Sequence, residues 1–199
     1  MTLLASDDGV LAVFAVADTI KPSSREAVAE LGRLGVVPVM LTGDNEATAL
    51  AIAREAGIAE VQGNLLPEDK LAAVEALQRR RGATAMTGDG INDAPALARA
   101  DIGIAMGAAG TDIAMEAADV VVMNDDLRRI PETIRLSRRT HAVLWQNIVF
   151  ALGLKAVFLL LAVAGSATMW MAVFADMGAS LIVVANGLRL LKAPVQARA

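Results

Sequence analysis

The stretch that decides the fold is Thr87-Gly88-Asp89-Gly90-Ile91-Asn92-Asp93-Ala94-Pro95-Ala96-Leu97, a loop with two carboxylates and an amide before a predicted helix start. Asp89 and Asp93 supply hard carboxylate oxygens, which suit Mg²⁺ better than a softer metal. Gly88 and Gly90 let the backbone approach an anion closely. A Mg²⁺ site beside exposed backbone amides is what phosphoryl transfer requires. Taken alone, the loop also fits a surface turn rich in Asp, Asn and Gly.

The composition divides the chain into a charged part and an apolar part. Of the 199 residues 55% are hydrophobic, and residues 143–191 are almost wholly apolar. The formal net charge of −4, with no basic patch interleaved with aromatic residues, argues against a nucleic-acid partner. The absence of cysteine excludes a disulfide, a thiolate metal site and a cysteine nucleophile. The first residues lack the basic and apolar regions of a signal peptide.

The charged part alternates short apolar runs with helical periodicity. Strands are expected at 10–17, 36–41, 60–65, 83–86, 102–105 and 120–123, with the run at 10–17 read as a buried strand. Helices are expected at 25–34, 46–56, 67–81, 94–99 and 111–117. This alternation predicts an α/β fold with a doubly wound parallel sheet.

Three polar sites follow predicted strands, and ligands bind at the carboxyl ends of the strands in such sheets. They are Asp18, the run Thr42-Gly43-Asp44 and the loop at 88–93. We therefore expect one crevice to gather all three.

Each candidate residue in this crevice has a chemical role. The Thr42 hydroxyl and the Gly43 amide are expected to bind a phosphoryl oxygen, with Asp44 beside them. Lys70 is expected to neutralise charge on that group, although a solvated surface lysine is the alternative for Lys70 alone. Asn92 is expected to bond phosphate or an acidic neighbour.

The apolar part predicts two membrane-spanning helices at 143–164 and 168–190, joined by a tight connection at 165–167. Each extends about 33 Å, enough to cross a bilayer. Basic residues flank both ends of the pair: Arg128, Arg129, Arg135, Arg138 and Arg139 before it, and Arg189, Lys192 and Arg198 at its close. They place both ends in the cytoplasm. A helical hairpin inside a soluble core is the alternative.

Lys155 and Asp176 are the charges inside these predicted spans. Both lie roughly 12–14 Å from the outer ends, so they are level and able to pair. A carboxylate at this depth suits a divalent cation, with Lys155 as competitor or counter-ion, and a purely structural ion pair is the alternative. Asn147 and Asn186 are also level, nearer the cytoplasm. His141, in a basic stretch at the membrane edge, favours interfacial packing over metal ligation.

Several segments of the chain resemble the phosphorylation domain of P-type ATPases, a branch of the haloacid-dehalogenase-like superfamily. They are Asp18-Thr19-Ile20-Lys21-Pro22, Met40-Leu41-Thr42-Gly43-Asp44-Asn45, Pro67-Glu68-Asp69-Lys70, the 87–97 loop, 100–107 and 111–120. The resemblance implies that Asp89 ligates Mg²⁺ with Asp93 and Asn92 in support. It also implies that Thr42, Gly43 and Lys70 contact an aspartyl-phosphate, and that the complete pump uses ATP.

The family's nucleophile lies in an Asp-Lys-Thr-Gly-Thr segment, which this sequence does not contain. The chain therefore resembles the C-terminal third of a transporter without its nucleotide-binding domain, and is expected to be inactive in ATP hydrolysis by itself. One alternative is a small phosphatase with Asp18 as nucleophile, although Ile20 stands where such enzymes carry a second acid. Another is a non-catalytic membrane fragment.

The polar residues of the two predicted spans resemble the zinc/cadmium/lead-exporting group of heavy-metal ATPases. The matching features are Asn147 ahead of Lys155, and Asp176-Met177-Gly178 ahead of Asn186. The expected partners are a divalent heavy-metal cation, the bilayer and a second polypeptide with the missing parts. The predicted domains are a partial phosphorylation domain at 1–126, on the cytoplasmic side, a basic helical linker at 127–142 and a transmembrane hairpin with its tail at 143–199.

Overall fold

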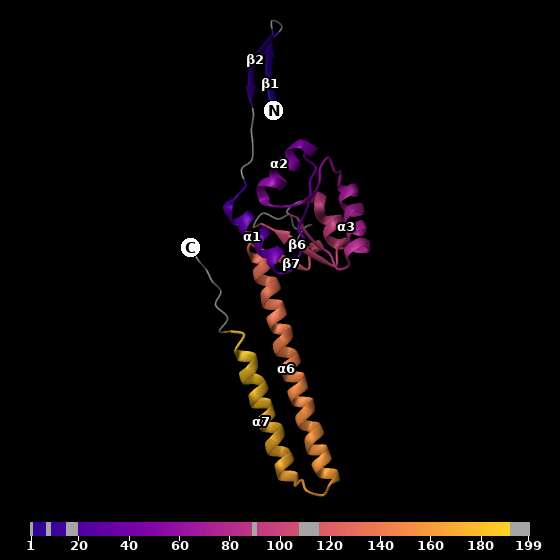
Figure 1. Cartoon of the computed structure of the whole chain (residues 1–199), viewed down its shortest axis with the longest axis vertical. Helices are drawn as coiled ribbons and strands as arrows, with labels where there is room; N and C mark the ends of the chain where they lie inside the picture. The colour runs from indigo at the N-terminus through magenta and orange to yellow at the C-terminus, as the bar shows by residue number, and fades with distance from the viewer. Residues whose placement is uncertain (1, 7–8, 15–19, 89–90, 108–115, 192–199) are drawn as a thin grey trace. The chain divides into compact units, whose positions relative to one another are not determined.

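The computed structural model describes residues 2–6, 9–14, 20–88, 91–107 and 116–191 of the chain (Figure 1). The chain divides into two compact units, Met1–Pro131 and Glu132–Ala199. The predicted domain boundaries at 126 and 142 stay predictions.

The first element is an antiparallel hairpin of β1 (Thr2–Ser6) and β2 (Gly9–Phe14), with an irregular register between Leu4 and Ala5. The expectation of a buried strand at 10–17 is wrong, because Val10 is 61% exposed and Leu11 is 67% exposed. An apolar run predicts a strand, but it does not show whether another part of the protein covers that strand. Among the described residues, β2 pairs only with β1.

Five further strands form two parallel sheets, which confirms the predicted parallel α/β fold. In the first sheet β3 (Val39–Leu41) pairs with β4 (Glu60–Gln62). In the second, β5 (Ala85–Gly88), β6 (Ile102–Met106) and β7 (Val120–Val122) follow the order β5-β6-β7. The carboxyl ends of β3 and β5 lead into the two loops that carry the candidate residues.

Each α-helix of this unit begins either after a capping asparagine or with a proline in its first turn. The helices are α1 (Pro22–Arg33), α2 (Glu46–Ala56), α3 (Pro67–Arg81), the 3₁₀ turn η1 (Ile91–Asp93) and α4 (Ala94–Arg99). The side chain of Asn45 accepts from the Thr48 amide at 2.9 Å, and Pro67 occupies the first turn of α3. The bounds predicted for α2, α3 and α4 are confirmed. The helix predicted at 111–117 lies, except for its last two residues, outside the described residues.

The core of the first unit is built from Val74 of α3, Met86 of β5, and Ala96 and Leu97 of α4. Leu41 of β3 packs against this cluster, so the two sheets share one core. Gly103 of β6 passes so close to α4 that a Cβ there would lie 2.7 Å from the Leu97 carbonyl oxygen. This packing fixes the positions of the loops after β3 and β5.

The second unit holds a hairpin of two long helices, α6 (Arg129–Val163), whose first three residues belong to the first unit, and α7 (Met169–Leu188). Figure 1 shows the two helices side by side. By length and composition both helices suffice to cross a membrane. Residues 129–142 of the predicted basic linker and residues 143–163 of the first predicted span form one helix. Between the helices, Gly165 adopts a left-handed φ of 73°, and the Thr168 hydroxyl accepts from the Met171 amide at 3.3 Å.

Candidate functional site

Lys70 and Asp93 are brought into direct contact from elements far apart in the sequence. Lys70 lies in the first turn of α3, and Asp93 ends the 3₁₀ turn that follows β5. The Lys70 Nζ donates to Asp93 Oδ1 at 2.7 Å, and the side chains are only 15% and 12% exposed. The start of α3 and the acidic loop therefore meet, as the sequence predicts.

Gly88 makes room for the Asp93 carboxylate. A Cβ at position 88 would lie 2.6 Å from the Asp93 Cβ and 2.7 Å from its Oδ2, distances that real side chains do not adopt. The sequence predicts a glycine close to an anion here. The anion observed beside it belongs to the protein itself.

The loop after β3 is closed by its own side chains. The Thr42 hydroxyl donates to Asp44 Oδ2 at 3.0 Å and accepts from the Asp44 amide at 3.1 Å. Among the described residues these groups are bonded to each other rather than to Lys70 or Asp93. Binding of a phosphoryl oxygen by this hydroxyl would require it to release the Asp44 carboxylate.

The loop after β3 packs closely on the loop after β4. The Leu65 amide donates to the Thr42 carbonyl at 3.1 Å, and the Asn64 amide donates to the Asp44 carbonyl at 2.7 Å. Gly63 permits this packing, because a Cβ there would lie 2.9 Å from the Glu46 Cα. Gly63 was not among the predicted site residues, and it lies within the strand predicted at 60–65, whereas β4 ends at Gln62. The second loop leads directly into α3, so these bonds link the position of Thr42 to that of Lys70.

Part of the predicted magnesium site can be compared with the structure. Asp89 and Asp18 lie outside the described residues, whereas Asn92 is described and exposed. The described part of the chain holds no cluster of three acidic or histidine side chains able to bind a metal. Asp93 still fits a hard cation, since no hydrogen bond among the described residues uses its Oδ2.

The opposite end of β5 is held by a carboxylate. Asp101 Oδ2 accepts from the Thr84 amide at 2.8 Å and from the Gln78 side chain at 3.1 Å. These two bonds, the one from Thr84 first, lower the pKa of Asp101 below its usual value. Asp101 thus ties α3 to the start of β5, away from the loop that follows Gly88.

In the second unit, Lys155 of α6 faces Asp176 of α7, which confirms that they are level. The Lys155 Nζ lies 3.8 Å from Asp176 Oδ1, with the side chains 71% and 66% exposed. They line a cavity of about 550 Å³ between the helices. Most other residues of its wall are small or β-branched: Ala151, Ala172, Ala175, Ala179, Ser180, Val183 and Val184, together with Leu154 and Phe158.

Asn147 and Asn186 also meet across the hairpin, as their predicted level implies. The Asn186 Nδ2 donates to Asn147 Oδ1 at 2.9 Å. Three further residues whose part in it was not predicted belong to this polar group, namely Gln146, Arg139 and Arg189. A signal was present for two of them, because Gln146 adjoins Asn147 and Arg189 lies three residues after Asn186.

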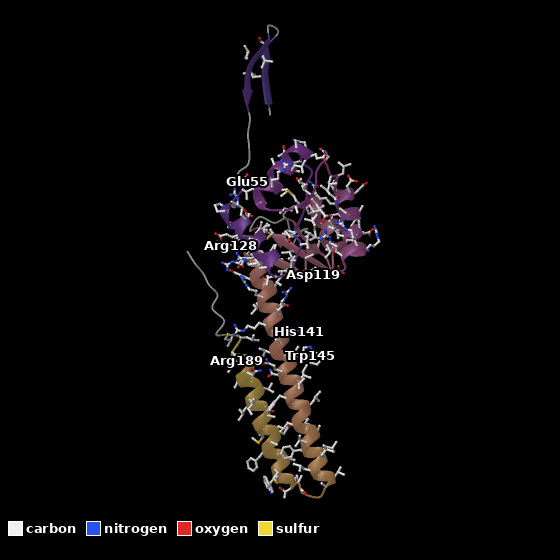
Figure 2. The ribbon with its side chains drawn as sticks, in the orientation of Figure 1. Glu55, Asp119, Arg128, His141, Trp145 and Arg189 are labelled. Carbon is white, nitrogen blue, oxygen red and sulfur yellow. The ribbon has the colours of Figure 1, made fainter. Side chains whose placement is uncertain are left out.

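His141 and Trp145 lie one turn apart on α6 (Figure 2). The Trp145 Nε1 donates to His141 Nε2 at 3.1 Å, with the rings edge to face. This bond occupies one of the two imidazole nitrogens, in agreement with a packing role for His141.

Comparison with known proteins adds three findings. Residues 3–101 match a family model described as haloacid dehalogenase-like hydrolase. A probable cadmium-transporting ATPase of Listeria monocytogenes is 50% identical over 191 residues, covering 96% of this chain and 27% of the relative. A zinc/cadmium/lead-transporting P-type ATPase of Escherichia coli strain K12 is 49% identical, covering 96% of this chain and 26% of the relative.

A solved structure resembles the chain over nearly its whole length. The crystal structure of a zinc-transporting PIB-type ATPase in an E2.Pi state matches with a TM-score of 0.86 and 49% identity. The match covers 95% of this chain and 31% of that one. The chain therefore spans about a quarter to a third of the proteins that it matches.

Proposed function

Because the chain belongs to the heavy-metal P-type ATPases, as a C-terminal portion of such a pump, we propose that it supplies two parts of a cation exporter. The first is the Mg²⁺- and phosphate-binding side of a phosphorylation site. The second is part of a transmembrane path for Zn²⁺, Cd²⁺ or Pb²⁺. The complete pump would couple ATP hydrolysis to export of the cation.

In the phosphorylation site, Asp89 and Asp93 would hold Mg²⁺, with Asn92 in support. Bound Mg²⁺ supplies positive charge against the phosphoryl group. The Lys70 ammonium would neutralise charge on the phosphoryl group, and the Asp93 carboxylate balances the ammonium while no phosphoryl group is bound. Thr42 and the Gly43 amide would bind a phosphoryl oxygen, with Asp44 accepting from the Thr42 hydroxyl beforehand.

The aspartate that becomes phosphorylated has to come from outside this sequence, which holds no Asp-Lys-Thr-Gly-Thr segment. A longer form of the chain or a second polypeptide would provide it, together with the nucleotide-binding domain. The chain is a membrane protein with its haloacid-dehalogenase-like unit on the cytoplasmic side, where ATP is available.

The observation that carries the proposed cargo is the Lys155–Asp176 pair beside the inter-helix cavity. An ionisable pair within an apolar hairpin is costly to keep, which favours a functional role. The Asp176 carboxylate offers oxygen ligands to a divalent cation. At 3.8 Å the Lys155 ammonium balances that carboxylate, and an arriving cation would take its place.

Cadmium titration of the whole chain in lipid nanodiscs tests this cargo. We expect Asp176→Asn to weaken cadmium binding by at least about tenfold, equivalent to ~1.4 kcal/mol, because it removes the charged ligand. Lys155→Met should strengthen binding, since it removes the competing cation. Asp125→Asn, at an exposed carboxylate of the other unit, is the matched control and should bind as the unmodified chain does. Equal cadmium affinity in Asp176→Asn and Asp125→Asn would overturn the proposed cargo site.

A further inference from the structure

A chain of hydrogen bonds crosses the α6–α7 hairpin at the level of its two asparagines. The Asn186 Nδ2 donates to Asn147 Oδ1 at 2.9 Å and to Gln146 Oε1 at 3.4 Å. The Asn147 Nδ2 donates to the Val183 carbonyl oxygen at 3.4 Å. Three side chains of two helices are thus joined at one level.

Two arginines extend this chain toward the end of α7. The Arg189 Nη1 donates to Asn186 Oδ1 at 3.0 Å. The Arg139 Nη2, from α6, donates to the carbonyl oxygen of Arg189 at 3.2 Å, where the helix presents its unpaired carbonyls. We call Arg139, Gln146, Asn147, Asn186 and Arg189 the amide clamp.

The amide clamp is poorly suited to bind a cation. The atom that an asparagine offers to a metal ion is its Oδ1, and the Oδ1 of both Asn147 and Asn186 already accepts a hydrogen bond. The donor to Asn186 is a guanidinium, whose positive charge opposes a second cation at the same oxygen. No carboxylate takes part in these bonds to compensate. A cation entering here would have to break the bonds and face the arginine.

The same bonds are well suited to hold two helices in register. Between helices in lipid there is little hydrophobic driving force, so close packing of small residues and interhelical hydrogen bonds determine how they associate. A single polar contact within an apolar interface can select one register. The Val183 carbonyl oxygen accepts from the Asn147 side chain, and Val183 also lines the cavity. The amide clamp therefore directly adjoins the site of Lys155 and Asp176.

We propose that the amide clamp sets the register of α7 against α6, so that Asp176 faces Lys155 across the cavity. Asn147 and Asn186 are then positioning residues and not cation ligands. A shift of α7 by one turn, about 5.4 Å, would separate Asp176 from Lys155. The register itself does not depend on any cargo. Only the consequence for cation binding rests on the proposed function.

A distance measurement tests the register directly, since the chain has no cysteine to remove. Spin labels on Leu144→Cys of α6 and Leu188→Cys of α7, both exposed, report the separation of the helices in nanodiscs. We expect one narrow distance in the labelled chain and a broadened or lengthened distribution in Asn147→Leu/Asn186→Leu. Asp176→Asn is the matched control and should keep the narrow distance. Asn186→Ser provides a milder change if the double variant does not insert.

Cadmium titration of aspartate variants separates positioning from ligation. If the asparagines were ligands, Asn147→Asp and Asn186→Asp would each strengthen cadmium binding by adding a charge. If the asparagines are positioning residues, the two aspartate variants should bind cadmium no more tightly than the unmodified chain. The double leucine variant should lose about 10- to 100-fold in cadmium affinity, as expected when a metal's supporting partners are removed. X-ray absorption should show the same cadmium coordination number before and after Asn186→Ser.

The possible results separate the two proposals. An unchanged label distance in both the double leucine variant and Asn186→Ser would overturn the amide clamp. Tighter cadmium binding in the aspartate variants would also overturn it. If the unmodified chain binds no cadmium, the proposed cargo fails, and the label distance alone decides whether the amide clamp exists.

Discussion

The Lys70 ammonium donates to the Asp93 carboxylate across 2.7 Å and joins the first turn of α3 to the loop that follows β5. Both side chains are mostly buried, so each charge depends on the other for compensation. The contact keeps a positive charge beside the candidate phosphate site and balances it while no phosphoryl group is bound. It therefore contributes to the stability of the unit as well as to its proposed chemistry.

Removing one partner of this pair should destabilise the first unit. We expect Lys70→Met to lower the free energy of unfolding by about 2–3 kcal/mol, because the Asp93 carboxylate remains buried without its counter-ion. Thermal unfolding of the whole chain, monitored through hydrogen exchange in α3 and β5, measures the effect. Arg33→Met breaks an exposed pair with Glu30, 3.8 Å apart, and should cost less than about 0.5 kcal/mol. An equal loss of unfolding free energy in the two variants would show that the Lys70–Asp93 pair stabilises the unit no more than an exposed ion pair does.

Two glycine-to-alanine substitutions should have opposite effects on stability. At Gly103 the new methyl group would meet the Leu97 carbonyl oxygen at 2.7 Å, so β6 and α4 would have to separate. We expect Gly103→Ala to cost about 1–3 kcal/mol. Gly32 lies within α1 with open space around it, so Gly32→Ala should stabilise the helix by about 0.5–1 kcal/mol. Thermal unfolding midpoints of the two variants check both signs, and destabilisation by both would contradict the open space around Gly32.

The sequence predicted the helices of the first unit better than the surroundings of its strands. The bounds of α2 and α3 follow from local chemistry, namely the Asn45 side chain that caps α2 and Pro67 at the start of α3. The burial of the run at 10–17 depended on which other strands lie beside it, which no local pattern contains. Val10 and Leu11 are exposed for this reason.

The contact between Lys70 and Asp93 was only partly predictable from the sequence. The carboxyl end of a predicted strand gave the loop that holds Asp93, whereas Lys70 was predicted from its place at the start of a helix. That these two bond to each other depends on the tertiary approach of α3 to the loop after β5. In the hairpin, helix rise alone placed Lys155 level with Asp176, whereas the bonds of Asn186 to Gln146 and Arg189 depend on helix rotation. Spacing fixes depth along a helix, and packing fixes which side chains touch.

The low pKa of Asp101 predicts a stability difference that depends on pH. Its carboxylate accepts from the Thr84 amide and the Gln78 side chain, so folding favours the charged form and lowers the pKa of Asp101 below its usual value. The stabilisation is complete above the unfolded-state pKa and is lost as pH falls through the folded-state pKa. Asp101→Asn should therefore unfold at a lower temperature than the unmodified chain near pH 7, and the gap should close as the pH falls through the folded-state pKa of Asp101. A gap that stays constant over this range would show that the charge of Asp101 contributes nothing.

The arrangement of the two sheets predicts how the chain would respond to the missing segment. Among the described residues β6 is hydrogen-bonded on both sides, to β5 and β7, whereas β3 and β5 each have one neighbour and do not pair with each other. Strands with an unpaired edge are templates for an added strand and exchange their amide hydrogens more readily. In hydrogen exchange on the whole chain, Ile102–Met106 should be protected more strongly than Val39–Leu41 or Ala85–Gly88.

Addition of a polypeptide that carries the missing nucleophile segment should raise protection in β3 and β5 and leave β6 unchanged. Protection that rises equally in all three strands would indicate general stabilisation instead, and no change in β3 or β5 would argue against completion of the site at these edges.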